Sequence, residues 1–397
     1  MRILILLMIW AAGLAYASVQ PAVTSPGSTA ATATALNNTL CTAIQPFYAE
    51  IGTNTGTQWS VVSPAGETTW TATTLIGVDS ASKWQYAELV AGVRGGLTGL
   101  SAADIAALNQ TDGYANMVDS TTTNDCVAPG NSPNFSCGAS APGTANSPQY
   151  CANQCGVDGV HTNIAQQPTA CAPGTYCYNG GHFQRHAVAN NTALIAQLDI
   201  SVMYAQYAAV FAAVSGWSYA PPYQGAKIQA PGGAFTEPLI AGGISQTPTH
   251  YAQFLQMILN SETLASILAG GNIAGNYVCA WSYTGGCSTA YYSPLTEKWD
   301  YAIGHWWEVD PANNNDWSVS SPGAAGFYPW ITPLCGGALC TSQSAFNTAY
   351  TTQRNGIWAF YGLIGRHATP SGETGAGQLS QKCAQVIRKA WVTGVQQ

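Results

Sequence analysis

The sequence has 397 residues, of which 11 are Lys or Arg and 18 are Asp or Glu, so only 7% are charged, against roughly a quarter in an average soluble domain. The formal net charge of -7 and the lack of any Lys or Arg run exclude a basic surface for nucleic acid or an anionic membrane. Hydrophobic residues make up 47% of the chain, which is enough to bury a large core. We therefore expect a folded protein with an uncharged polar surface and no nucleic-acid partner.

The N-terminus has the three parts of a secretory signal peptide. Met1 and Arg2 are followed by an apolar run over residues 3–14 and by Ala-Tyr-Ala at 15–17, and a small-x-small sequence is a typical cleavage site. A membrane anchor is the alternative, but the run is short for a membrane span and no basic cluster follows it. We expect a signal peptide over 1–17 and a secreted or periplasmic protein that is not attached to a membrane after cleavage.

Composition and hydrophobic spacing divide the rest of the chain. Residues 18–32 are rich in Ser, Thr, Ala, Pro and Gly, which predicts a leader linker before a folded part over 33–397. The predicted elements are a helix over 36–47, extended segments at 59–62 and 68–76, a helix over 80–89, a loop over 110–175, helices over 199–214 and 250–268, strands over 301–309, 326–331 and 357–364, and a helix over 378–395. Strands near both ends predict one α/β unit built from two distant segments, with 96–275 as a helical and Cys-rich insertion.

The 12 cysteines of an exported chain predict disulfide bonds rather than redox thiols. Two pairs bracket short segments that contain Gly-Gly, Cys335 with Cys340 and Cys279 with Cys287, and each pair could close a small loop. Six others crowd one Pro-, Gly- and Asn-rich region, where crosslinks lower the entropy cost of ordering a long loop: Cys126, Cys137, Cys151, Cys155, Cys171 and Cys177. The alternative in that region is a zinc site on Cys151, Cys155 and His161.

The first candidate site is the sequence Ser-Ala-Ser-Lys at residues 80–83, which follows an apolar run at the start of a predicted helix. Three-residue spacing puts Ser80 and Lys83 on one helical face, where the amine can reach the hydroxyl. A lysine removed from water has a lowered pKa and can take the serine proton, while N–H dipoles at a helix N-terminus stabilise the charge that forms. The alternative is that Ser80 only caps the helix.

A second segment, Pro-Gly-Thr-Tyr-Cys-Tyr-Asn-Gly-Gly-His at residues 173–182, resembles the Pro-Gly-Thr-x-Phe-x-Tyr-Ser-Asn-x-Gly-Tyr region of class C β-lactamase-like serine hydrolases. The resemblance implies that Tyr178 is a proton-transfer partner of the serine. Asn179 follows the tyrosine directly, and Gly180 stands where the family has the asparagine that binds the substrate amide. A buried aromatic with a satisfied hydroxyl is the alternative for Tyr178.

A third segment, Ser-Pro-Gly-Ala-Ala-Gly-Phe-Tyr from residue 321, is similar to the Lys-Thr-Gly or His-x-Gly strand of the same superfamily. The resemblance implies that Ser321 and Gly323 lie at the substrate, and that the N–H groups of Ser80 and Ala324 hold the oxyanion. Ser321 replaces a Lys or His, which removes a positive charge that many penicillin-recognising enzymes use for a carboxylate. The alternative is a Gly-rich bend in an ordinary strand.

Looser matches extend the resemblance over residues 41–395, apart from 115–170. Thr111 to Gly113 resembles the Thr-Ser-Gly turn of the family. Ala241 to Ser245, with the helix after it, resembles its Gly-Gly-x-x-Ser segment, and Tyr301 to Trp306 resembles its Tyr-Gly-x-Gly-x-Trp strand. The family implies an antiparallel sheet flanked by terminal helices, with a helical and loop-rich insertion domain. Its first and last helices pack on one face of the sheet, which implies a disulfide between Cys41 and Cys383.

Other residues that could carry chemistry have simpler readings. His182 and His186 have a spacing that can bind metal, but no glutamate lies between them and no third ligand is evident, so we expect packing or surface histidines and no metal. His305 lies among aromatic residues, where it is equally a pocket or a core residue. The 13 tryptophans could line a sugar-binding cleft, although scattered core aromatics are the more common arrangement.

The motifs predict an exported serine hydrolase that forms an acyl-enzyme on an ester, amide or lactam bond without a cofactor. The neutral Ser321 favours an esterase-like activity over a β-lactamase or D-amino-acid peptidase, unless a cation comes from elsewhere in the fold: Arg94, Arg185, Arg354 or Arg366. We expect a monomer whose partner is a small-molecule or short-oligomer substrate. The alternative of another class is a catalytically silent, disulfide-linked binding protein.

Overall fold

The computed structural model describes part of the chain. The described residues are 27–94, 99–113, 172–183, 186, 241–242, 244–260, 297, 299–308, 318–340, 359–368 and 375–395, together with short strands between 118 and 292. The predicted signal peptide, the helix predicted at 199–214, the cysteines of the crowded region other than Cys177, and the alternative zinc ligands lie outside them. No helix in the described part is both long and apolar enough to cross a bilayer.

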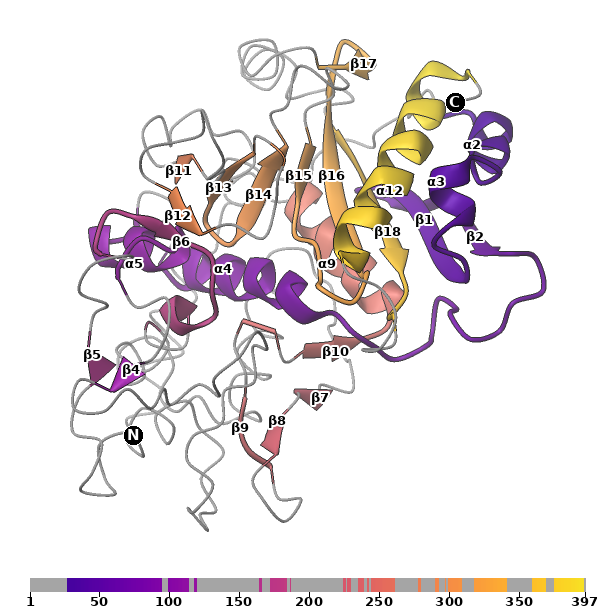
Figure 1. Ribbon diagram of the computed structural model, residues 1–397. Helices are drawn as coiled ribbons and strands as arrows, with labels where there is room; N and C mark the ends of the chain where they lie inside the picture. The colour runs from indigo at the N-terminus through magenta and orange to yellow at the C-terminus, as the bar shows by residue number, and fades with distance from the viewer. Residues whose placement is uncertain are drawn as a thin grey trace, which may run out of the picture.

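An antiparallel sheet is the centre of the described structure, as predicted (Figure 1). Its strand order is β11-β13-β14-β15-β16-β18-β1-β2, and β17 pairs with β16. The bounds are β1 (Phe47–Thr53), β2 (Gly56–Ser63), β11 (Val278–Cys279), β13 (Asp300–Ala302), β14 (His305–Glu308), β15 (Ser318–Ser320), β16 (Tyr328–Cys335), β17 (Ala338–Leu339) and β18 (Ala359–Gly365). Because β1 pairs with β18, from Tyr48 opposite Gly365 to Gly52 opposite Tyr361, the two distant ends of the chain build one sheet.

Helices cover both faces of this sheet (Figure 1). On one face lie α2 (Thr29–Ala35), α3 (Thr39–Thr42) and α12 (Ala376–Thr393), and on the other lie α4 (Ser82–Val93) and α9 (Pro248–Asn260). The alternation of side chains along a strand produces the two layers. In β1, Phe47 and Ile51 pack in the cluster that includes α12, whereas Tyr48 packs in the cluster that includes α4 and α9.

Two predicted disulfides are present. Cys41 of α3 is bonded to Cys383 of α12, which links the first and last helices on one face of the sheet, and Cys335 is bonded to Cys340 across the turn between β16 and β17. Cys177 is also disulfide-bonded. No cysteine in the described part is a free thiol. The predicted partner of Cys279 lies outside the described residues.

Several predicted helices and strands are confirmed. The structure has α4 where 80–89 was predicted to be helical, α9 over the first part of 250–268, and α12 over most of 378–395. The strands predicted at 59–62, 326–331 and 357–364 correspond to β2, β16 and β18.

The prediction of one helix over 36–47 is wrong. The helix α2 begins earlier, at Thr29, within the predicted leader, because the side chain of Ser28 caps it by accepting the N–H of Ala31 at 3.2 Å. Asn38 then starts the separate helix α3 by accepting the N–H of Leu40 at 2.9 Å. An Asn cap of this kind favours a new helix start over a continuous helix, so the apolar periodicity crosses a break.

Two predicted strands also differ from the structure. Where one strand over 301–309 was predicted, residues 300–308 form a hairpin of β13 and β14, because Ile303 and Gly304 have φ values of 45° and 78° and reverse the chain. In the segment 68–76, only the last residue enters a strand, β3 (Ile76–Gly77). Thr residues bond one another before it, for example the N–H of Thr71 to Thr74 Oγ1 at 3.0 Å, and these local bonds replace a strand ladder.

A buried acid on α4 predicts how the stability of the fold depends on pH. Glu88 is fully buried and accepts the indole N–H of Trp84 at 3.1 Å. Burial raises the pKa of Glu88 from 4.5 to about 8, although the bond from Trp84 opposes this. The folded state therefore holds a proton that the unfolded chain releases, so stability is full below pH about 4.5 and falls as pH rises toward about 8.

We expect Glu88→Gln to match the wild type near pH 4.5 and to exceed its thermal stability increasingly as pH rises to 8, because the amide carries no proton that must be held. Thermal unfolding of both proteins between these pH values measures the difference. Glu67→Gln, which removes an acid in a surface loop, is the control. A difference between Glu88→Gln and wild type that stays constant over this range would contradict the prediction.

Candidate active site

Ser80 lies in a 3-10 turn, η1 (Asp79–Ala81), that leads directly into α4. The segment before the turn is held by the pairing of β3 with β10 (Ile244–Gln246). The turn itself is held by α9, because the hydroxyl of Tyr251 donates to the carbonyl oxygen of Ala81 at 2.9 Å. The turn is therefore fixed to other elements at both ends. Ser80 itself is partly exposed.

Lys83 lies one helical turn after Ser80 and points back to it. Its Nζ donates to Ser80 Oγ at 2.9 Å and to the backbone oxygen of Ala241 at 3.0 Å. The structure thus brings together the two residues that the Ser-x-x-Lys spacing predicted to be neighbours. The bond to Ala241 fixes the amine from the other side, so Nζ is oriented at the serine oxygen.

Burial changes the protonation of this lysine. The side chain of Lys83 is almost fully buried, and removal from water lowers its pKa to about 7, while the negative charge of Asp79 opposes the shift. About half of the amine is then neutral near pH 7, and a neutral amine in contact with a hydroxyl can accept its proton. A serine that only caps a helix does not require a buried lysine amine in contact with its hydroxyl.

Tyr178 forms the other side of the lysine environment. Lys83 Nζ lies 4.6 Å from the centroid of the Tyr178 ring, so the contact is with the ring face. The ring stacks on Trp306 with centroids 5.2 Å apart and meets Tyr301 edge-on at 5.9 Å. The strand pair β13 and β14 therefore holds Tyr178 against Lys83. These three aromatic residues belong to a cluster around the site rather than to an open sugar-binding cleft.

The residues after Tyr178 form a turn that packs on the chain after α5 (Ala102–Leu108). The N–H of Asn179 donates to Gln110 Oε1 at 2.6 Å, and the N–H of Gly180 donates to the side-chain oxygen of Asn179 at 2.6 Å. The Asn179 oxygen thus serves a local turn. The substrate contact predicted for Asn179 and Gly180 remains a prediction.

The segment from Ser321 lies directly against η1, the turn that carries Ser80. Ser321 Oγ donates to the backbone oxygen of Ser80 at 3.1 Å, although the two residues are far apart in sequence. Gly323 allows this approach, because a Cβ on it would lie 2.5 Å from the backbone oxygen of Val78. The third motif therefore meets the first, at the loop between β15 and β16.

Ala324 is exposed at the tip of this loop, where the resemblance places the second oxyanion donor. The amides on either side of it are engaged: the N–H of Gly323 donates to the oxygen of Phe327 at 2.7 Å, and that of Ala325 to Asp79 Oδ2 at 2.8 Å. These two bonds fix the orientation of the peptide groups around Ala324.

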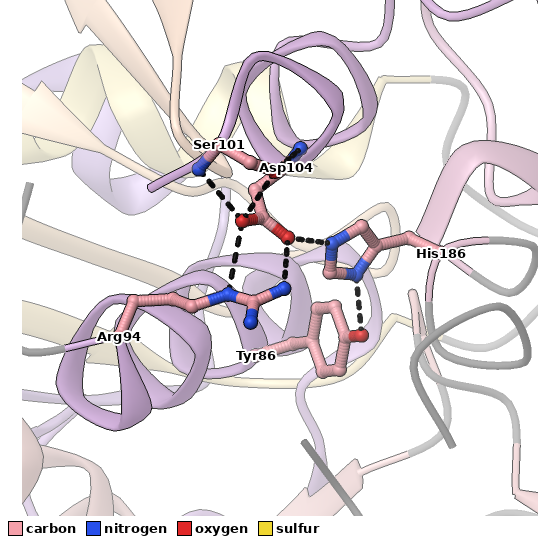
Figure 2. A network of polar contacts seen from close by, with 5 residues as sticks. All are labelled: Tyr86, Arg94, Ser101, Asp104 and His186. Carbon is pink, nitrogen blue, oxygen red and sulfur yellow. Dashed lines mark hydrogen bonds and ion pairs between the residues drawn. The ribbon is translucent and has the colours of Figure 1, made fainter. Parts of the chain in front are cut away.

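A polar network centred on Asp104 connects α4, α5 and His186 (Figure 2). Asp104 accepts hydrogen bonds from Nε and Nη2 of Arg94, each at 3.0 Å, and lies 2.7 Å from His186 Nε2. The other ring nitrogen of His186 lies 2.8 Å from the hydroxyl of Tyr86. Burial alone would raise the pKa of Asp104, but the bonds from His186, Arg94 and Ser101 lower it well below its usual range. Because Tyr86 lies on α4 and His186 follows Tyr178 in sequence, the network links the two segments that meet at Lys83.

The histidines have separate structural partners. His182 is buried and contacts Asp112 and the backbone oxygen of Cys177, whereas His186 belongs to the Asp104 network. Neither is a surface residue, and no cluster of metal-ligating side chains occurs among the residues the structure describes. His305 is a core residue that stacks on Trp84, and burial lowers its pKa to about 4.

Two of the four arginines considered as carboxylate partners lie in described segments. Arg94 is bound to Asp104 and so belongs to the Asp104 network. Arg366 is buried at the end of β18, where its aliphatic part lies 3.1 Å from the position of a Cβ on Gly326. Arg185 and Arg354 lie outside the described side chains.

Sequence reasoning missed three parts of the site. The carbonyl of Ala241 gives Lys83 its second bond, the turn at Gly304 lies so close that a Cβ there would be 2.6 Å from the Lys83 oxygen, and Asp79 bonds the loop after Ser321. Asp79 had a visible signal, an acid directly before the serine in a chain with few charges, whereas Ala241 and Gly304 lay in matched segments without an assigned contact to Lys83.

No protein-family model and no curated protein matches this chain. Solved structures similar to it include a class C β-lactamase from Rhodobacter sphaeroides (12% identity, TM-score 0.45, covering 90% of this chain and 99% of that chain). Others are a β-lactamase/D-alanine carboxypeptidase from Yersinia pestis (11%, 0.44, 86% and 93%) and a D-stereospecific amidohydrolase from Streptomyces sp. (13%, 0.41, 93% and 99%). Because the TM-scores lie below 0.5, the case for the site rests on its own geometry.

The protonation of Lys83 predicts a pH profile. If neutral Lys83 is the base, kcat/KM rises with pH through about 7 and levels off above it, because the protonated amine cannot accept the serine proton. Hydrolysis of a substrate without a titratable group, measured from pH 5.5 to 9, gives the profile. Rates that are independent of pH between 6 and 8 would contradict the assignment of Lys83.

Proposed function

We propose that this protein is an exported serine hydrolase that forms an acyl-enzyme at Ser80. The observation that carries the proposal is the 2.9 Å hydrogen bond from the buried amine of Lys83 to Ser80 Oγ. Burial of a lysine is unfavourable while it is charged, so a lysine in this position favours the neutral form. The amine is directed at a hydroxyl and a carbonyl, and of these two groups only the hydroxyl has a proton to give.

The proposed reaction gives each group one role. Lys83 takes the Ser80 proton as Oγ forms a bond to the substrate carbonyl carbon, and the N–H groups of Ser80 and Ala324 stabilise the oxyanion. The intermediate collapses, the bond to the leaving group breaks, and Lys83 with Tyr178 returns the proton to that group. Water then attacks the acyl carbon and gives a proton to the same pair. The pair passes this proton to Ser80 Oγ as the acyl–oxygen bond breaks, which releases the acid and restores the serine hydroxyl.

The surroundings of Ser321 favour neutral esters or amides as substrates. Its side chain is buried and its hydroxyl donates inward to the Ser80 carbonyl, so it offers no positive charge to a substrate carboxylate. A neutral hydrogen bond contributes roughly 1 kcal/mol, against about 1.5 to 3 for one to a charged group. A β-lactamase or D-amino-acid peptidase, whose substrates carry a carboxylate, is the second candidate.

Export is part of the same proposal. The signal-like N-terminus and the 12 cysteines support it, and so do the disulfides that join α3 to α12 and β16 to β17. The steps above use only side chains and backbone groups of this chain, with a small molecule or short oligomer as the substrate.

We expect Ser80→Ala to abolish covalent labelling by a fluorophosphonate or a penicillin while the protein stays folded, because it removes the nucleophile but at most a helix cap worth about 1 kcal/mol. Intact-mass analysis measures the adduct, and circular dichroism checks the fold. The control Thr73→Ala removes an exposed hydroxyl from the loop before β3 and should keep the labelling. Labelling that persists in Ser80→Ala would exclude the mechanism, and a wild type without any adduct would favour a catalytically silent binding protein.

The order of substrates is a separate prediction. A p-nitrophenyl ester should have a higher kcat/KM than a chromogenic cephalosporin, because Ser321 provides no charge for the cephalosporin carboxylate. Purified protein and the Ser80→Ala variant are compared on both substrates. Efficient cephalosporin turnover that Ser80→Ala abolishes would reverse the preference and leave the nucleophile in place.

A further inference from the structure

The residue directly before the nucleophile has an unfavourable backbone conformation. Asp79 has a φ of 47°, one of three positive values among the described non-glycine residues. This left-handed region is costly for residues with a Cβ, and glycine adopts it most readily. An aspartate in such a place is retained only where surrounding interactions favour its side chain.

The side chain of Asp79 makes such an interaction. Its Oδ2 accepts the N–H of Ala325 at 2.8 Å. The oxygen of Ala325 in turn accepts the N–H of Ala368 at 2.6 Å, which fixes the next peptide group of the loop to the segment after β18. With the bond from Ser321 Oγ to the Ser80 oxygen, the loop is fastened to the nucleophile turn on both sides of Ala324.

The carboxylate also lies in the electrostatic environment of the catalytic lysine. Burial raises the pKa of Asp79, whereas the Ala325 N–H and the charges of His367 and Lys83 oppose this rise. His367 approaches from the segment after β18: a Cβ on Gly77 would lie 3.4 Å from its ring and 4.0 Å from Asp79 Oδ1. The groups that face Lys83 are the Ser80 hydroxyl, the Ala241 carbonyl, the Tyr178 ring and the charge of Asp79.

We propose that Asp79 is a positioning residue that fastens the oxyanion loop to the nucleophile turn and sets the charge around Lys83. The inference rests on the proposed function, since it assigns Asp79 a part in the same reaction. Asp79 acts through Ala325 on the peptide at Ala324 and through its charge on Lys83, without touching the substrate. A negative charge beside the amine favours the protonated lysine, so Asp79 moves the working range of the base toward higher pH.

Two substitutions separate the two effects. Asp79→Asn keeps an oxygen that can accept the Ala325 N–H but loses the charge, so the acidic limb of the kcat/KM profile should move to lower pH by about 0.5 unit or more, with kcat at its plateau nearly unchanged. Asp79→Gly loses both and relieves the backbone, so kcat should fall at least about tenfold with a smaller change in KM, because the oxyanion contacts act in the transition state.

The design distinguishes positioning from mere tolerance of the aspartate. If Asp79 had no role, Asp79→Gly would be as active as the wild type, because glycine is the better residue at this φ. Glu67→Gln is the matched control: it also removes one negative charge, in a surface loop, and should leave both kcat and the pH profile unchanged. Wild-type kcat in Asp79→Gly would overturn the positioning role of Asp79, and an unmoved acidic limb in Asp79→Asn would overturn its electrostatic role.

A measurement without substrate separates this inference from the proposed function. The chain has five lysines, Lys83, Lys227, Lys298, Lys382 and Lys389, so the ¹³Cε resonance of Lys83 in labelled protein can be assigned by its loss in Lys83→Met. Its pKa should be lower in Asp79→Asn than in the wild type, and unchanged in Glu67→Gln. A wild type that forms no Ser80 adduct would remove the proposed function, whereas an unchanged Lys83 pKa in Asp79→Asn would remove only the electrostatic role of Asp79.

Discussion

The removal of Lys83 from water is the constraint on which the site depends. A buried amine needs polar or aromatic partners, and those of Lys83 come from separate parts of the chain. Ser80 comes from the turn before α4, Ala241 from the segment before β10, and the Tyr178 ring from the segment after β6 (Tyr176–Cys177). Each partner is fixed by further contacts, such as the stacking of Tyr178 on Trp306. The geometry around the Lys83 amine is therefore a property of the assembled fold rather than of the Ser-x-x-Lys motif alone.

The scarcity of charge in the sequence makes the location of the buried charges informative. In the described part, Glu308 and Arg388 form an ion pair that joins β14 to α12. Asp104 pairs with Arg94 at the C-terminal end of α4. Glu50 accepts the hydroxyl of Tyr48 at 2.6 Å within the layer between the sheet and α9. Such groups are costly to bury unless each finds its partner. They favour a single arrangement of helices against the sheet, and the position of α4 relative to the sheet is what places Ser80 beside the loop from Ser321.

The sequence predicted the parts of the fold and the site that depend on local spacing or on a recognisable motif. The contact of Lys83 with Ser80 follows from three-residue helical spacing, and the strands β16 and β18 follow from aromatic and β-branched runs. The break between α2 and α3 was not predicted because the apolar periodicity continues through it while the Asn38 cap decides the structure. The hairpin at Ile303 was missed for a similar reason, since a positive φ at a β-branched residue has no signal in composition.

The remaining features could not be predicted because they are made between residues distant in sequence. No spacing rule connects Ala241 to Lys83 or Tyr86 to His186, and the orientation of either pair appears only once the sheet has brought their segments together. The pairing of β1 with β18 explains how distant segments come together, because it joins the two ends of the chain in one sheet. The disulfide between Cys41 and Cys383 links the helices on one face of that sheet. With that face fixed, the sheet gives α4 and α9 a defined surface to pack on. The turn that carries Ser80 is then the place where the N-terminal end of α4, the loop before β16 and the segment after β18 meet. A glycine such as Gly323 allows the close contact between these elements.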